Sequence, residues 1–266
     1  MQNLISLSTD LGAGNKGIGV MKAAILEIFP EATIIDLEHD NAPCDILQGA
    51  RNFEAVAWLP KGTHVCVIDP GVGTARKGII IETGRGDFLV GPDNCVLIPA
   101  TRFLNGIKKV VHISNEKFFK NPVSPVFHGR DVFAPCTAHL SKGIAIEEFG
   151  EELNEKQLVG APFEEAIAKN NEISAEAIHI NRFGNVFLNI MQKEMHKLFS
   201  EGEKIQLIVK NKKIVLPYKK TFGEVALKKE AIMDDDFGRV EIATNQGNFA
   251  KKYSIKQGEK IVLRKR

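Results

Sequence analysis

The stretch HVCVIDPGVGTARKGIIIET, residues 64–83, contains two largely apolar runs separated by a polar, glycine-containing loop. Apolar runs of four to eight residues without alternation are typical of strands that are buried on both faces of a sheet. The first run ends directly on Asp69, which is followed by Pro70, Gly71 and Gly73. In an open α/β sheet, ligands bind beyond the carboxyl ends of the strands. We therefore expect Asp69 to lie at a ligand-facing edge of a covered sheet.

Similar apolar runs occur on both sides of this stretch, and helical patterns alternate with them. The runs are NLISLS (3–8), ATIIDL (32–37) and KVVHIS (109–114), and the helical patterns span 17–29 and 44–59. This alternation predicts an α/β domain with a largely parallel sheet.

The pattern changes near residue 165, after which helical periodicity almost disappears. Short strands with turn residues between them are expected within 175–190, 203–218 and 238–250. We predict two domains, an α/β domain over 1–170 and a smaller all-β domain over 171–266.

The composition excludes several classes of protein. The chain has 266 residues, of which 44% are hydrophobic, and its net charge is +2 with acids and bases interspersed. We therefore expect neither nucleic acid nor a membrane as a partner. The start of the chain lacks the pattern of a secretory signal, and we expect a cytoplasmic protein. The four cysteines are widely spaced, so no zinc site, other metal site or disulfide framework is predicted.

Three further polar loops contain Asp, Gly or Asn at the positions where ligands are expected. They are Thr9–Gly12, Pro92–Asn94 and Phe127–Asp131. Each could serve only for capping or chain reversal, and Arg130 could simply pair with Asp131. A phosphate-binding loop at Gly71–Gly73 is disfavoured, because the loop leads into a strand and not into a helix. Four such loops together favour a binding site.

At this point the sequence resembles the S-adenosyl-L-methionine (SAM) hydroxide adenosyltransferases, or SAM hydrolases, which are related to fluorinases and chlorinases. The resemblance covers nearly the whole chain and is specific, because several separate motifs occur in the same order. They are STDLG (8–12) with GVMKA (19–23), IDPGVGTAR (68–76), VGPDN (90–94), FHGRD (127–131), INRFGN (180–185) and FGRVEIATNQGNFA (237–250).

The resemblance implies a β-barrel-like second domain, and a homotrimer whose sites lie between subunits. It implies that water or hydroxide displaces methionine from the ribose C5′ of SAM, giving adenosine and L-methionine without a cofactor. The implied catalytic residues are Asp69, Arg76 and His128. A carboxylate can orient a water and accept its proton, and a sulfonium leaves as a neutral thioether.

The resemblance also implies substrate contacts over the length of SAM. Asp10 would take both ribose hydroxyls, as a bidentate carboxylate can. Phe183 and Asn185 would lie near the adenine and its ribose, and the turn from Asn245 to Gly247 would bind the adenine edge through its backbone. A plain hairpin turn is the competing explanation for Asn245 and Gly247.

The methionine half departs from the family pattern. Asn181 stands where an acid is expected for the ammonium group, Asp236 where a serine meets the carboxylate, and Cys44 where an aromatic residue flanks the substrate. Another 5′-substituted adenosine is therefore an alternative substrate, and a sensor that binds without turnover is an alternative function. A halogenase is disfavoured, because those relatives have an inserted loop and lack the acid that Asp69 supplies here.

Overall fold

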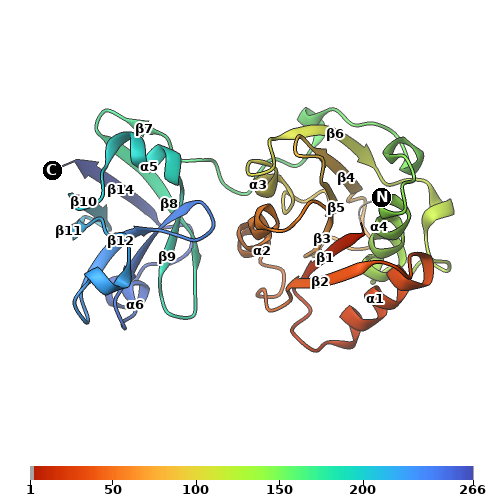
Figure 1. The fold of residues 1–266 in the computed structure, drawn as a ribbon, viewed down its shortest axis with the longest axis horizontal. Helices are drawn as coiled ribbons and strands as arrows, with labels where there is room; N and C mark the ends of the chain where they lie inside the picture. Colours follow the sequence, from red (N-terminus) through yellow and green to blue (C-terminus); the bar gives the residue numbers. More distant parts are fainter. Residues whose placement is uncertain (1–2, 266) are drawn as a thin grey trace. The chain divides into compact units, whose positions relative to one another are not determined.

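The computed structural model describes residues 3–265, and the chain divides into two compact units between Pro162 and Phe163 (Figure 1). This division lies a few residues before the boundary predicted at 170. The segment after Pro162 belongs to the second unit because Ala166 N–H donates to Asn189 O over 2.8 Å, and Glu165 forms an ion pair with Arg239. Within the described residues, no helix has the length and apolar character needed to span a bilayer.

The first unit contains a six-stranded sheet in the order β2-β1-β3-β5-β4-β6. Strands β2, β1, β3 and β5 are parallel to one another, whereas β4 pairs antiparallel with both β5 and β6. The loop from β4 to β5, residues 84–87, is too short for the crossover that parallel strands require. The strands are β1 (Leu4–Thr9), β2 (Thr33–Glu38), β3 (Thr63–Val67), β4 (Gly78–Thr83), β5 (Phe88–Pro92) and β6 (Ile107–His112).

Helices cover both faces of this sheet, with α1 and α4 on one face and α2 and α3 on the other (Figure 1). Successive strand residues alternate between the two cores, since Val65 packs on the α1 side and Cys66 on the α2 side. These helices are α1 (Lys16–Ile28), α2 (Ile46–Phe53), α3 (Ile98–Thr101) and α4 (Ala134–Ser141). Short 3-10 segments occur at Glu54–Trp58, Glu116–Phe118, Ile146–Phe149 and Glu155–Gln157.

The second unit is an antiparallel sheet in the order β11-β10-β14-β8-β9-β13-β12, with β7 paired to β8. An isolated bridge between Tyr218 and Ile232 links the end of β11 to β12, which nearly closes the sheet into a barrel. The strands are β7 (Ala168–Lys169), β8 (Glu172–Ile180), β9 (Val186–Met191), β10 (Lys204–Val209), β11 (Lys212–Pro217), β12 (Glu230–Asp234), β13 (Arg239–Thr244) and β14 (Lys260–Lys265). The predicted fold class is confirmed for both units.

Two short helices and a 3-10 segment of the second unit were not predicted. They are α5 (Gln192–Leu198), α6 (Phe249–Tyr253) and the segment Phe222–Glu224. Helix α6 has only five residues and begins at the side chain of Asn248, which accepts a hydrogen bond from Lys251 N–H. A helix of little more than one turn is too short to produce a periodic pattern in the sequence.

Candidate active site

The polar loops that follow β1, β3 and β5 meet at one edge of the first sheet, as predicted. Thr9 is paired with Val67, and Val65 with Val90, so the carboxyl ends of the three parallel strands are level. The loop after β5 also supports the loop after β3, because Asn94 Nδ2 donates to the carbonyl oxygen of Ile68 over 2.8 Å. This hydrogen bond holds the backbone immediately before Asp69.

Asp69, Arg76 and His128 form one hydrogen-bonded cluster at this edge. Arg76 donates to Asp69 through Nε over 3.1 Å and through Nη2 over 2.5 Å. The same Nη2 lies 3.2 Å from His128 Nδ1. The Asp69 and Arg76 side chains are 5% and 9% exposed, and the guanidinium also packs on the ring of Phe133. The three residues predicted from the resemblance therefore lie together.

His128 is neutral in this arrangement. Burial and the neighbouring positive charge of Arg76 lower the pKa of His128 below its ordinary value of 6.5. Because a guanidinium can only donate, Nδ1 of His128 must be the acceptor, and Nε2 must carry the hydrogen. The cluster thus contains an oriented carboxylate and an imidazole N–H donor.

A single π-helical turn, Gly129–Phe133, positions His128 at its N-terminal end. Such turns are frequent at functional sites. The adjacent Arg130 and Asp131 form a two-point ion pair with each other at 2.6 and 2.8 Å, and Asp131 also accepts a hydrogen bond from Ser124 N–H. The pairing of Arg130 with Asp131 is therefore confirmed, whereas Asp131 lies inside the π-helical turn and does not cap a helix. The two residues hold the loop that carries His128.

Of the two glycines in the loop after Asp69, one position excludes a side chain and the other has room for one. Gly73 has a φ of +75°, and a Cβ atom there would overlap the carbonyl oxygen of Pro125. At Gly71, a Cβ atom would meet its nearest neighbours at an ordinary 3.5 Å. Gly73 is needed so that this loop can pack against the segment leading to His128.

Asp10 follows β1 and accepts a hydrogen bond from Cys44 N–H through Oδ2 over 2.8 Å. Its loop is held from beneath by His39, whose role the sequence did not indicate. His39 Nδ1 lies 2.9 Å from Thr9 Oγ1, and His39 Nε2 lies 3.1 Å from Asp36 Oδ1. The contact with Thr9 could not be read from the sequence, because Thr9 lies 30 residues away on β1.

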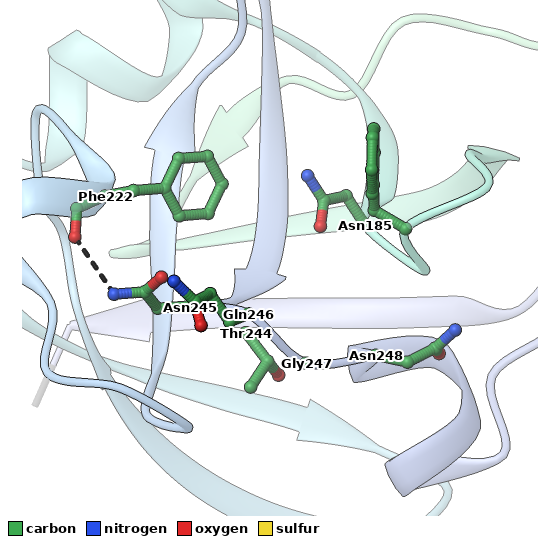
Figure 2. A pocket seen from close by; sticks show the side chains of 8 residues that line it. Asn185, Phe222, Thr244, Asn245, Gln246, Gly247 and Asn248 are labelled. Atoms are coloured by element: carbon green, nitrogen blue, oxygen red, sulfur yellow. Dashed lines mark hydrogen bonds between the residues drawn. The ribbon is translucent and has the colours of Figure 1, made fainter.

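The second unit contains a hollow of about 500 Å³, which we call the C-terminal hollow. Figure 2 shows Asn185 and Phe222 facing one another across it, with the 244–248 segment along one side. The lining residues are Phe183, Asn185, Phe222, Thr244, Asn245, Gln246, Gly247 and Asn248. Phe183 is 76% exposed, so its ring is accessible to a ligand or partner.

The hollow brings together four predicted residues, Phe183, Asn185, Asn245 and Gly247. Phe222 was not predicted, because it lies in a short segment without a motif. Asn245 holds that segment, since its Nδ2 donates to Val225 O over 2.6 Å and to Phe222 O over 3.3 Å (Figure 2).

Two of the turn residues use their backbone N–H groups within the protein. Asn245 N–H donates to Lys229 O, and Gly247 N–H donates to Thr244 O. Within residues 3–265, the backbone N–H of Gln246 has no such partner. Gln246 is therefore the turn residue whose N–H is available to a ligand.

Asn181 and Asp236 do not line the C-terminal hollow. Asn181 Oδ1 accepts hydrogen bonds from the N–H groups of Phe183 and Asn185, both at 3.0 Å, so it shapes the turn that carries them. Asp236 is exposed in the turn before β13, whereas Asn245 follows the other end of that strand.

Two models of one protein family match this chain, one within each unit. The model for the SAM hydroxide adenosyltransferase N-terminal domain matches residues 5–150, and the model for the C-terminal domain matches residues 175–262. The chain belongs to the SAM hydroxide adenosyltransferase family. The resemblance noted in the sequence is therefore confirmed.

Individual relatives within and around this family are similar over nearly their whole lengths. An (R)-S-adenosyl-L-methionine hydrolase from Salinispora tropica is 32% identical over 97% of this chain and 96% of its own. The crystal structure of an uncharacterized conserved protein from Thermotoga maritima superposes with a TM-score of 0.91 at 31% identity, covering 98% of this chain and 100% of that chain. A fluorinase from an Actinoplanes species is 24% identical over 98% of this chain and 97% of its own.

Proposed function

We propose that this protein hydrolyses SAM to adenosine and L-methionine. The observation that carries the proposal is the hydrogen-bonded cluster of Asp69, Arg76 and His128 at the ligand-facing edge of the sheet. Family membership and the names of the hydrolase relatives support it.

The cluster has the groups that activation of water requires. The Asp69 carboxylate, oriented by Arg76, accepts a hydrogen bond and then the proton from the attacking water, while the Nε2–H of His128 can donate to the water oxygen. The oxygen forms a bond to C5′ as the C5′–S bond breaks, and the bonding electron pair leaves with sulfur. A general base of this kind contributes about 10²–10⁴-fold to the rate.

The adenosine half of the substrate would use two groups of residues. Asp10 binds the ribose hydroxyls through its carboxylate, whose orientation the Cys44 N–H fixes. The adenine occupies the C-terminal hollow between Phe183, Phe222 and Asn185, where aromatic faces can stack on the base.

The residues expected around the methionine part of SAM are also compatible with a second substrate. The oxygen of Asn181 already accepts two backbone hydrogen bonds, and Asp236 would place an acid near the substrate carboxylate. These observations favour, as the alternative, a 5′-substituted adenosine that lacks the amino-acid group. Comparing turnover of SAM with that of 5′-methylthioadenosine would separate the two substrates.

The assembly and the location are also proposals. We propose a homotrimer in which each site combines the N-terminal domain of one subunit with the C-terminal domain of a neighbour, as the family resemblance implies. Sedimentation analysis would test the trimer. A cytoplasmic location is supported by Cys44, Cys66, Cys95 and Cys136, all of which are free thiols.

The decisive experiment is incubation of the purified protein with SAM, followed by chromatography of adenosine and methionine. Asp69→Ala is the control, and its loss of turnover would support the proposed chemistry. A protein that retains SAM without converting it would be a sensor, and a 5′-halo product formed only with chloride would indicate a halogenase. Either result would overturn the hydrolase proposal.

A further inference from the structure

A buried carboxylate, Glu241 on β13, contacts the amide of Asn185 from behind the C-terminal hollow. Asn185 Nδ2 donates to Glu241 Oε2 over 3.0 Å, and each residue is only 8% exposed. The two ends of an asparagine amide have almost the same shape, so their hydrogen-bond partners decide which end faces which way. In the structure the nitrogen of the Asn185 amide faces Glu241, because it donates the hydrogen bond that the carboxyl oxygen accepts.

The carbonyl oxygen of Asn185 is consequently the end of the amide that remains for a ligand. Within residues 3–265, Asn185 Oδ1 has no hydrogen-bond partner, and it is not sealed from solvent. Figure 2 shows the amide turned toward the hollow, opposite Phe222. Gln246 also lines the hollow, and within residues 3–265 its backbone N–H has no partner, so the lining contains one free acceptor and one free donor.

This pair of groups matches one class of purine and opposes another. A 6-aminopurine carries a donor, its exocyclic amine, beside ring nitrogens that accept. A 6-oxopurine carries an acceptor at position 6 and a donor at N1, which is the reverse pattern. A site whose polar groups are left unpaired by the wrong ligand rejects that ligand strongly.

We propose that Glu241 is a positioning residue that makes the hollow selective for a 6-aminopurine, by holding the oxygen of Asn185 toward the base. The inference rests on the proposed function, which places the adenine in this hollow. It adds the residue that sets the choice of base, although Glu241 itself does not line the hollow.

The test is the ratio of the affinities for adenosine and inosine, measured by calorimetry on the full-length protein. We expect the wild type to prefer adenosine by about ten- to hundredfold, as the penalty for unpaired buried groups predicts. In E241Q, the new amide can donate as well as accept, so the Asn185 amide can reverse and present its NH₂ to O6 of inosine. The ratio should then fall to within about threefold, mainly through weaker adenosine binding.

Two further variants make the comparison specific. E241D keeps an acceptor-only group, so it should preserve a preference for adenosine. E230Q makes the same acid-to-amide change on β12 of the same hairpin, where Glu230 pairs with Lys252 and lies outside the hollow. E230Q should leave the ratio unchanged. If the role of Glu241 were only structural, E241Q would weaken the binding of adenosine and inosine equally.

The outcomes separate this inference from the proposed function. If the wild type binds adenosine and E241Q keeps the wild-type ratio, the role of Glu241 is refuted and the hydrolase proposal stands. If the wild type binds adenosine and inosine equally well, the role of Glu241 is also refuted. This outcome does not depend on whether E241Q folds. If the wild type binds neither nucleoside at millimolar concentration, both proposals fail together.

Discussion

Arg76 donates two hydrogen bonds to the carboxylate of Asp69, from Nε over 3.1 Å and from Nη2 over 2.5 Å. The two-point geometry fixes the plane of the carboxylate, which a single hydrogen bond would not do. Both side chains are almost fully buried, so this orientation is maintained before any substrate binds. The cluster is therefore preorganised for the reaction that we propose.

Replacing Asp69 by asparagine should abolish most activity with little change in shape. The amide cannot accept a proton, so we expect D69N to lower kcat for SAM by about 10²–10⁴-fold. D45N is a matched control, because Asp45 caps α2 and asparagine caps helices equally well. A D69N enzyme that keeps more than about a tenth of the wild-type kcat would contradict a general-base role.

Arg76 should be sensitive both to loss of charge and to loss of shape. R76M leaves Asp69 buried without its partner, and we expect it to lower the free energy of unfolding by about 3–5 kcal/mol. R76K keeps the charge but not the two-point geometry, so kcat should fall while much of the stability remains. Urea denaturation and steady-state kinetics measure the two effects. Equal stability of R76M and wild type would show that the pair is not a buried one in solution.

We expect the activity to fall at acidic pH because His128 becomes protonated. Its pKa is lowered below 6.5 by burial and by Arg76, so the folded protein binds this proton less readily than the unfolded chain. Stability from the neutral form is present above pH 6.5 and is lost as the pH falls through the folded pKa. We therefore expect kcat to be constant above neutrality and to decline as the pH falls from 6.5 through the folded pKa of His128.

The matched variant for this profile is H128N, whose Oδ1 can replace Nδ1 as the acceptor for Arg76. H128N should lose the decline that is due to histidine, although its kcat at neutral pH will be lower. If H128N and wild type decline in parallel, another group must titrate.

Gly73 and Gly71 provide a matched pair of alanine substitutions. G73A places a side chain at a positive φ and against Pro125 O, so we expect a loss of about 1–3 kcal/mol in the free energy of unfolding, with reduced activity. G71A should stay within about 0.5 kcal/mol of wild type. Urea denaturation of both variants checks this, and equal effects would refute the assigned role of Gly73.

Much of the fold could be predicted from the sequence, because strand and helix patterns are local. The apolar runs at 32–37, 64–68 and 78–83 coincide closely with β2, β3 and β4. The reversed direction of β4 is decided by a short loop, residues 84–87, and not by the strand's own pattern. The brief helices α5 and α6 carried too few residues to be recognised.

For the site, three features of the sequence indicated the residues that we propose for the chemistry: Asp69 shortly after a strand, Arg76 in the loop that follows, and His128 in a separate motif. Their types and order were sufficient for the family resemblance. Three relationships are visible only in the folded chain: Asn181 shapes a turn, Phe222 faces Asn185, and Glu241 accepts a hydrogen bond from the Asn185 amide. These relationships join residues far apart in the chain, and hydrogen-bond direction depends on spatial neighbours that no local pattern encodes.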